Sequence, residues 1–302
     1  MPRCARLALP NVPLHIIQRG NNRQACFFAD EDYRVYLDWL GEYADKTGCQ
    51  IHAYVLMTNH VHLLMSAAQP AASGALMKAL GQRYVQYVNR TYRRSGTLWE
   101  GRFRSCPTQE ENYLLACQRY IELNPVRAGM VEHPAEYRWT SYRGNAQGEA
   151  DPLLKPHSLY LALGTDAASR EEAYRALFRY ELEPGLVDEI RRATNGNYAL
   201  GHAAFAEQVS AALGQRAAPG KSGRPRRVTE PESGELFGEC SQSWSVPNAI
   251  KLSHNPLNPN KINESPTGLV SHEEQILVQI TDPAHEASIR TARLNVLSDS
   301  IQ

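Results

Sequence analysis

Two apolar segments joined by only two residues constrain the fold of this chain most strongly. The segments "CQIHAYVLM" (49–57) and "HVHLLM" (60–65) are separated by a Thr-Asn dipeptide. A connection this short predicts an antiparallel hairpin. Because successive strand side chains point to opposite faces, His60 and His62 should project side by side from one face. The alternate side chains should point into a core: Val61, Leu63 and Met65.

The segments around this hairpin predict further strands and helices. We expect a strand at 13–20, a helix at 30–47 capped by Asp30 and stopped by Gly48, a helix at 72–94, a strand at 97–108 and a helix at 109–124. The order strand, helix, strand, strand, helix, strand is that of a ferredoxin-like α+β antiparallel sheet. The additional helix after the last strand would lie within reach of the histidine face.

The chain changes character after residue 145. Amphipathic segments at 169–182, where Ser169 and Glu172 would form a capping box, at 185–194 and at 201–214 predict a small helical accessory region. The residues from 228 onward are rich in Asn, Pro and Ser with little periodicity, which is typical of disorder. We therefore expect three parts: 1–145 with the catalytic sheet, 146–227 with helices and a basic "GRPRR" end, and an acidic tail at 228–302.

A net charge of zero over the 302 residues hides an asymmetry. Residues 1–227 carry 28 Lys and Arg against 22 Asp and Glu, a net of +6, and residues 228–302 carry 4 against 10, a net of −6. The segment "RYVQYVNRTYRR" (83–94) interleaves arginines with tyrosines, which suits phosphate contacts and base stacking. The alternative is a solvated helix whose tyrosines pack on the core. The candidate DNA-binding residues are Arg83, Arg90, Arg93, Arg94, Arg102, Arg104, Arg224, Arg226 and Arg227.

Composition excludes two classes of protein. The six cysteines form no C-x-x-C pair and no short secreted framework, so we interpret them as reduced thiols rather than a zinc ribbon or disulfide scaffold. There is no basic-then-apolar leader and no apolar run near the ~20 residues of a membrane helix. We therefore expect a cytoplasmic protein.

A second pair of polar residues could complete a site with the two histidines. Tyr120 and Asn124 are four residues apart and share one face of the predicted helix 109–124, which Pro125 should end. If this face packs on the histidine strand, His60, His62 and the Asn124 amide oxygen can bind a divalent cation. Mixed nitrogen and oxygen ligands with open positions suit Mg²⁺ or Mn²⁺.

The phenol of Tyr120 would then stand beside a metal-bound phosphate. Attack on phosphorus would give a phosphotyrosine, which a free DNA 3′-OH could later reverse without ATP. Tyr113 lies one heptad earlier and is the rival nucleophile. Alternatively, Tyr120 is a core tyrosine and Asn124 a helix cap.

Together these motifs resemble those of REP-associated tyrosine transposases, a branch of the single-tyrosine HUH transposases (IS200-like). The segments that carry the resemblance are "PRCARLALPNVPLHIIQRGNNRQACFF", "HAYVLMTNHVHLLM", "LWEGRFRS", "YLLACQRYIELNPVRAGMV" and "YRWTSYRG", with a looser likeness through "LGHAAFAEQV" to "GRPRR". The resemblance implies a ferredoxin-like fold, His60-Val61-His62 as the metal motif, Tyr120 as the nucleophile and Asn124 as third ligand. It also implies a bacterial, nucleoid-associated enzyme that cleaves and rejoins single-stranded DNA near a palindromic hairpin, as a monomer or homodimer.

Two other functions fit some of these features. A domesticated, non-catalytic protein could bind palindromic DNA through the basic helix and "GRPRR" alone, although it would need neither the histidines nor Tyr120. A metal-dependent hydrolase would use water as nucleophile and leave no protein attached to DNA.

Overall fold

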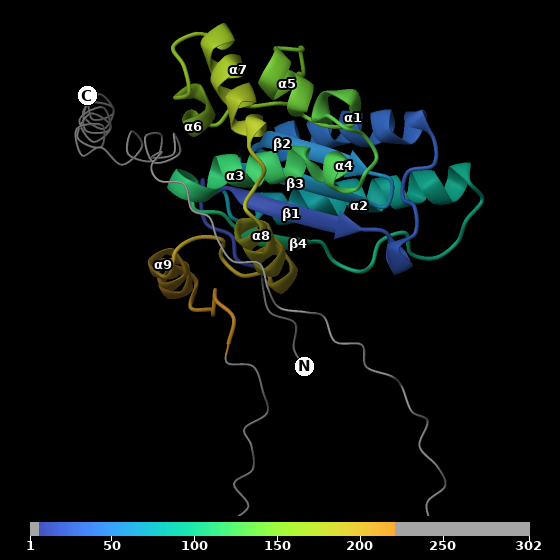
Figure 1. Ribbon diagram of the computed structural model, residues 1–302. Coiled ribbons are helices and arrows are strands. Elements are labelled where there is room, and N and C mark those ends of the chain that lie inside the picture. The colour runs from blue at the N-terminus through green and yellow to red at the C-terminus, as the bar shows by residue number, and fades with distance from the viewer. Residues whose placement is uncertain (1–5, 221–302) are drawn as a thin grey trace, which may run out of the picture. The chain divides into compact units, whose positions relative to one another are not determined.

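A four-stranded antiparallel sheet forms the centre of the fold. The computed structural model describes residues 6–220, which lie within one compact unit spanning Met1–Val228. The strands are β1 (Leu14–Arg19), β2 (Cys49–Met57), β3 (His60–Ala67) and β4 (Arg104–Pro107), in the order β2-β3-β1-β4. With a helix between β1 and β2 and another between β3 and β4, this is the predicted ferredoxin-like α+β topology (Figure 1).

The predicted hairpin forms as expected. β2 and β3 pair antiparallel across Thr58 and Asn59, and β1 lies on the other side of β3 with Ile17 opposite His62 and Arg19 opposite His60. The side chains that alternate with the histidines are fully buried: Val61, Leu63 and Met65 are each 0% exposed. The hairpin therefore presents one face to an apolar core and the histidines to the other face.

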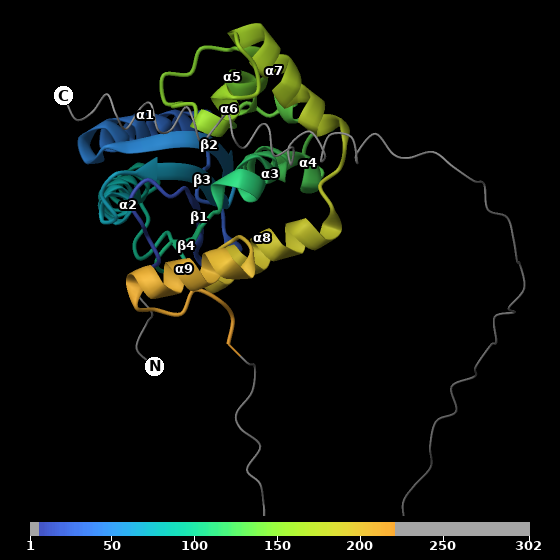
Figure 2. The same cartoon turned by 90° about the vertical axis from the view of Figure 1, so that its left-hand side faces the viewer.

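Helices α1 (Asp30–Thr47) and α2 (Ala72–Thr91) cover the apolar face (Figure 2). Gly48 ends α1 at φ 69°, as predicted. The start differs, because the carboxylate of Asp32 rather than Asp30 accepts from the exposed backbone amides, those of Phe28 and Ala29. A carboxylate inside the first turn can reach back to these amides, so the cap lies two residues further along than predicted.

The opposite face of the sheet is covered by α3 (Glu110–Glu122), α4 (Asn124–Arg127) and α8 (Pro184–Gly196) (Figure 2). The expected helix 109–124 is thus shorter by two residues at its end. Pro125 does not stop the helical path but lies in the first turn of α4, where a missing amide hydrogen costs nothing. The break at Leu123 turns Asn124 back toward the end of α3.

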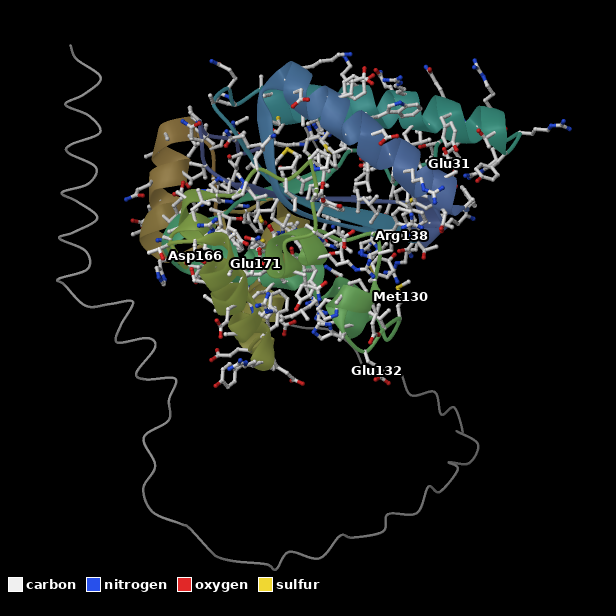
Figure 3. All side chains as sticks on the ribbon, turned by 90° about the horizontal axis from the view of Figure 1, so that it is seen from above. Glu31, Met130, Glu132, Arg138, Asp166 and Glu171 are labelled. Atoms are coloured by element: carbon white, nitrogen blue, oxygen red, sulfur yellow. The ribbon has the colours of Figure 1, made fainter. Side chains whose placement is uncertain are left out.

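The remaining helices lie beyond the two edges of the sheet. These are α5 (Tyr142–Gln147), α6 (Ser158–Leu161), α7 (Ala167–Ala176) and α9 (Ala203–Leu213), with 3₁₀ turns η1 (Asn21–Arg23), η2 (Pro134–Glu136) and η3 (Leu177–Arg179). The residue before α7, Asp166, is labelled in Figure 3. It is the N-cap, and its side chain accepts from the Ser169 amide. The predicted cap at Ser169 was therefore wrong by three residues, because the carboxylate upstream competes for the same amides.

The predicted strand at 97–108 shrinks to the four residues of β4. The preceding segment instead bonds to the end of β1: the Glu100 amide donates to Arg19 and the Asn21 amide to Leu98. Gly101 interrupts the extended path at φ 86°. The result is a loop that carries Arg102 to the rim of the sheet, where Arg104 begins β4.

Some predictions fall outside the described residues. No helix within residues 6–220 is long and apolar enough to cross a bilayer. Arg224, Arg226 and Arg227 and the tail at 228–302 lie beyond this range. The predicted boundary at 145/146 remains untested; α5 spans it, and the helices that follow pack within the same unit.

Candidate metal and nuclease site

His60 and His62 project side by side from β3, as their spacing predicts. Their ring centroids are 5.1 Å apart and the rings are nearly perpendicular, at 77°. His62 is 3% exposed, because α3 and α8 lie over this face, whereas His60 at the strand end is partly exposed. A group approaching from solvent would meet His60 first and His62 behind it.

Each histidine has one ring nitrogen held by a neighbour. His60 Nδ1 lies 2.6 Å from Asn59 Oδ1, and the amide nitrogen of Asn59 donates to the Arg23 carbonyl at 3.0 Å, which fixes that oxygen toward the ring. His62 Nδ1 lies 2.8 Å from His15 Nε2. The Nε2 atoms of His60 and His62 therefore remain available for another ligand.

Both histidines are neutral at physiological pH. Burial, aided by the nearby Arg19 charge, lowers the pKa of His60 to about 4. Burial also holds the pKa of His62 well below its usual range, with His15 and His60 adding to the effect. Because a metal binds the unprotonated imidazole, these side chains need not lose a proton to bind one.

Tyr120 is brought to the histidines by the last turn of α3. Its ring is 6% exposed and lies edge-on to His62, with centroids 5.9 Å apart, and to His15 at 5.8 Å. Arg127 of α4 holds it from the other side: the guanidinium lies 4.1 Å from the ring centroid and donates to the Tyr120 carbonyl at 2.6 Å. The Tyr120 ring is thus fixed between the rings of His15 and His62 on one side and the Arg127 guanidinium on the other.

Asn124 combines the two roles considered for it. Its side-chain nitrogen donates to the carbonyls of Tyr120 at 3.1 Å and Ile121 at 3.2 Å, which caps the end of α3. The amide oxygen makes neither of these bonds. It is therefore left to act as a hard oxygen ligand.

One cavity unites these side chains. It has a volume of about 220 Å³. We call it the catalytic pocket; it is lined by His15, Ile17, Arg19, His60, His62, Tyr120, Asn124, Arg191, Thr194 and Asn195. Among residues 6–220 no three His, Cys, Asp or Glu side chains gather closely enough to hold a metal, so a cation here would need the amide oxygen of Asn124 beside the two imidazoles. The donor set fits Mg²⁺ or Mn²⁺, with positions left open.

A second cavity adjoins the catalytic pocket and is rich in arginine. It has a volume of about 310 Å³ and shares Ile17, Arg19 and Asn195 with that pocket. We call it the arginine pocket; its other lining residues are Arg23, Glu100, Gly101, Arg102 and Arg104. Arg104 is oriented by Asn195, whose side-chain oxygen accepts at 2.9 Å. Arg102 and Arg104 are thus the two predicted DNA-binding residues that lie beside the site.

The predicted arginines of α2 and the loop after it lie elsewhere. Arg83 pairs with Glu42 of α1 at 2.6 Å, and Arg94 lies over the Phe28 ring. Arg90 and Arg93 are exposed, and α2 covers the face of the sheet opposite α3 (Figure 2). These four side chains therefore do not line the catalytic pocket, and their contact with DNA stays a prediction.

The tyrosines of the same segment are structural. Tyr84 is 0% exposed and donates to the Cys26 carbonyl. Tyr87 and Tyr92 both donate to the buried carboxylate of Asp32, at 2.9 and 2.8 Å. The alternative of tyrosines packed on the core is correct for this helix, because their hydroxyls satisfy a buried charge.

The rival nucleophile, Tyr113, lies away from His60 and His62. The Tyr113 ring packs edge-on against His202, with centroids 5.7 Å apart. Unlike Tyr120, it does not line the catalytic pocket. The geometry therefore favours Tyr120.

The sequence did not point to three side chains that position others at this site: His15 and Thr194 line the catalytic pocket, and Arg127 packs on Tyr120 outside its lining. His15 and Thr194 contact each other at 2.9 Å, and Arg127 holds Tyr120. A histidine in the apolar segment "PLHIIQRG" was the one available signal, since a polar side chain inside a predicted strand needs a partner. Thr194 carried no signal, because it lies 179 residues from His15 in the chain.

Parts of the chain are similar to known proteins. The family described as "Transposase IS200 like" matches residues 8–124. A solved structure of a REP-associated tyrosine transposase bound to a REP hairpin aligns with 53% of this chain and 93% of its own, at 14% identity and a TM-score of 0.44. The crystal structure of a protein described as a transposase from Deinococcus radiodurans R1 aligns with 40% of this chain and 96% of its own, at 24% identity and a TM-score of 0.29. No curated protein matches significantly.

Proposed function

We propose that the chain, whose residues 8–124 match the family described as "Transposase IS200 like", cleaves and rejoins single-stranded DNA through a covalent bond to Tyr120. The observation that carries the proposal is the content of the catalytic pocket. Two neutral histidines, an amide oxygen and a tyrosine line one cavity of about 220 Å³. A protein that only binds DNA needs none of these groups.

His60, His62 and Asn124 are the residues that would hold Mg²⁺ or Mn²⁺. When bound, the cation supplies Lewis-acid polarisation of the scissile phosphate. The two imidazoles and the amide oxygen leave positions open for phosphate oxygens.

Tyr120 supplies the nucleophile. Its phenol gives up its proton to solvent as the oxygen attacks phosphorus and forms the P–O bond of a phosphotyrosine. The bond from phosphorus to the DNA 3′ oxygen breaks, and that oxygen takes a proton from solvent and leaves as a hydroxyl. The bond energy is conserved, so attack by a free 3′-OH reverses the step and joins two strands. Arg127 orients the phenol ring throughout, because it contacts both the ring and the backbone carbonyl of Tyr120.

The arginine pocket gives the DNA strand a path to Tyr120. It adjoins the catalytic pocket at Arg19, and four arginines line it: Arg19, Arg23, Arg102 and Arg104. Guanidinium groups form paired hydrogen bonds with phosphate oxygens. A flexible single strand could place successive phosphates along this pocket and the scissile one beside the histidines. We extend the proposal to hairpin-flanked DNA because the sequence motifs resemble those of REP-associated enzymes.

A covalent-adduct assay tests this proposal. The full chain is incubated with a labelled hairpin-flanked single strand and Mn²⁺, and the product is separated under denaturing conditions. We expect a labelled protein band for the wild type and for Tyr113→Phe, and none for Tyr120→Phe. Hairpin binding should persist in Tyr120→Phe, because the phenol oxygen contributes little to affinity.

The same assay distinguishes the other two functions. Cleaved DNA with free ends and no attached protein would indicate a hydrolase that uses water. Tight hairpin binding without cleavage in Mg²⁺ or Mn²⁺ would indicate a non-catalytic DNA-binding protein. An adduct that survives in Tyr120→Phe but disappears in Tyr113→Phe would reassign the nucleophile.

A further inference from the structure

His15 lies behind the proposed metal ligands and has no role in holding the cation itself. It stands on β1, is 1% exposed, and stacks on His62 with ring centroids 5.0 Å apart. Both of its ring nitrogens have partners: Nε2 lies 2.8 Å from His62 Nδ1 and Nδ1 lies 2.9 Å from Thr194 Oγ1. The three side chains therefore form a continuous hydrogen-bonded chain that ends at a proposed ligand.

The direction of each hydrogen bond follows from the far end of this chain. The single hydroxyl hydrogen of Thr194 is donated to the Ile190 carbonyl at 2.8 Å, one turn earlier in α8. Thr194 Oγ1 can therefore only accept from His15, so the His15 proton is on Nδ1. A neutral imidazole with a proton on Nδ1 has a lone pair on Nε2.

The next bond is fixed in the same way. Because His15 Nε2 can only accept, His62 must donate from Nδ1. His62 then carries its lone pair on Nε2, the nitrogen that His15 does not occupy. Cys106 Sγ, at 3.3 Å from Thr194 Oγ1, is compatible with this assignment because its thiol can donate to the remaining lone pair of the hydroxyl.

We propose that His15 and Thr194 are positioning residues that hold His62 as its Nδ1–H tautomer, so that Nε2 faces the bound cation. This inference rests on the proposed metal-dependent function. Hydrogen bonds behind a ligating histidine fix its ring orientation and raise its basicity. Here the support comes from another histidine, and that histidine is set by a threonine of α8.

The origin of Thr194 gives this arrangement a further consequence. Residues 8–124 contain the histidines, Tyr120 and Asn124, but Thr194 follows seventy residues later, in the helical region. α8 packs on β4 and β1 and so closes this side of the cluster (Figure 2). The helical region therefore contributes to the ligand geometry as well as to the surface of the protein.

The tautomer can be measured on the full chain without metal or DNA. Long-range ¹H–¹⁵N correlation of the imidazole rings distinguishes Nδ1–H from Nε2–H histidines. We expect His62 and His15 to show the Nδ1–H form in the wild type, with resonances assigned by His62→Ala and His15→Leu. A wild-type His62 protonated on Nε2 would overturn the proposal.

Mn²⁺ affinity gives a second measurement that does not depend on cleavage. Titration of the full chain, followed by the electron paramagnetic resonance signal of free Mn²⁺, reports the dissociation constant. We expect His15→Leu to weaken binding about 10- to 100-fold, the usual effect of removing the partner behind a ligating histidine. His15→Gln can present a side-chain oxygen to His62 Nδ1–H and should recover part of the affinity.

Thr194→Val and Thr194→Ser form a matched pair that leaves His15 in place. Valine keeps the shape but removes the hydroxyl, whereas serine keeps the oxygen that accepts from His15. We expect Thr194→Val to weaken Mn²⁺ binding several-fold and to show a mixture of His15 tautomers, and Thr194→Ser to match the wild type. Thermal unfolding of each variant checks that the fold persists, and the pair still decides the question if His15→Leu does not fold.

The outcomes separate this inference from the proposed function. If the wild type binds Mn²⁺ but Thr194→Val and His15→Gln bind it equally well, the positioning role is wrong and the metal site stands. If the wild type binds no Mn²⁺, the proposed function fails at its metal site, and the inference that rests on it fails too. A loss of affinity in Thr194→Ser equal to that in Thr194→Val would indicate packing rather than a hydrogen bond.

Discussion

The side-chain nitrogen of Asn124 caps α3 and its oxygen is a proposed metal ligand, and substitution can separate the two roles. Its nitrogen bonds to the carbonyls of Tyr120 and Ile121, and its oxygen remains for a cation. Asn124→Asp keeps an oxygen ligand but loses both donors, so we expect Mn²⁺ binding to persist while the free energy of unfolding falls by about 1 to 2 kcal/mol. Asn124→Ala should lose both the oxygen ligand and the two capping hydrogen bonds. Mn²⁺ titration and urea unfolding of the two variants check this, and wild-type Mn²⁺ affinity in Asn124→Ala would remove Asn124 from the ligand set.

Arg127 should affect the rate of the covalent step rather than DNA affinity. Its planar guanidinium lies on the Tyr120 ring and bonds to the Tyr120 carbonyl at once, which a lysine cannot do. We expect Arg127→Lys to slow adduct formation by roughly tenfold, because a small displacement of a reacting group is costly. Arg138→Lys is the matched control, since Arg138 also stacks on a ring at 4.6 Å, but that ring is Trp139, which does not line the catalytic pocket. Equal rates in the two variants would show that Arg127 does not orient the phenol.

The sequence could predict the proposed ligands and nucleophile but not the side chains that orient them. His60 and His62 follow from strand alternation and Tyr120 and Asn124 from helical spacing, which are local rules. The contact of His15 with Thr194 depends instead on how α8 packs against β1, and no local pattern encodes that packing. Arg127 could not be predicted for a related reason, because its contact with Tyr120 depends on the break at Leu123, which bends α4 back over Tyr120.

At the scale of elements, the buried carboxylate of Glu122 links α3, the helix that carries Tyr120, to the helices beyond the sheet edge. Glu122, in the last turn of α3, is 0% exposed and accepts from three donors. These are Ser141 Oγ at 2.6 Å, Asn145 Nδ2 at 2.9 Å and Tyr174 Oη at 2.7 Å. Two of the donors come from α5 and the residue before it, and the third from α7, which Figure 3 shows with Asp166 and Glu171 labelled. The position of Tyr120 thus depends on helices that lie outside residues 8–124.

This carboxylate should make stability depend on pH. Burial raises the pKa of Glu122 from 4.5 to about 7, although the three hydrogen bonds oppose the shift. Because the pKa is raised on folding, Glu122 ionises at lower pH in the unfolded chain than in the folded protein. Its contribution to the free energy of unfolding is therefore fully present below pH 4.5, is lost as the pH rises to about 7, and does not change further above that pH. We expect the wild type to lose roughly 2 to 3 kcal/mol relative to Glu122→Gln between pH 5 and pH 7.5.

Urea unfolding of both proteins across this range measures the difference, in which all other titrating groups cancel. Glu136→Gln provides a control, because that carboxylate is exposed. Parallel pH profiles for the wild type and Glu122→Gln would show that the buried carboxylate stays ionised, which three strong donors could achieve only by outweighing its desolvation.

The limits of helices and strands could be predicted where turn or cap residues in the sequence end the segment. The limits of α1 and of the first hairpin strand match the prediction, because a tight turn and a left-handed Gly48 fix them. The second hairpin strand begins at His60 as predicted but continues to Ala67, two residues further. The strand expected at 97–108 failed because its apolar residues are buried singly: Leu98, Trp99 and Phe103 pack into the core from a loop. Apolar composition alone cannot distinguish that loop from a strand. Helix caps shifted by two or three residues because several polar side chains near each start compete for the same amides.

At the scale of the whole molecule, charge is divided between the two ends of the chain. Residues 1–227 carry a net charge of +6 and residues 228–302 a net charge of −6. The acidic segment should repel DNA at low salt. We therefore expect a chain ending after Arg227 to retain hairpin binding and adduct formation.

A chain that also lacks residues 221–227 should bind more weakly, because it loses Lys221, Arg224, Arg226 and Arg227. Each lost phosphate contact should flatten the slope of log affinity against log salt by about 0.7 on single strands and about 0.9 on duplex. If the "GRPRR" segment enters the minor groove of the hairpin stem, its loss should also reduce the preference for a paired stem over a scrambled one. If it only contacts phosphates, affinity should fall equally for both DNAs. A salt titration with the two DNAs separates these cases, and an unchanged affinity and slope would exclude the segment from DNA binding and leave the arginine pocket as the principal phosphate contact.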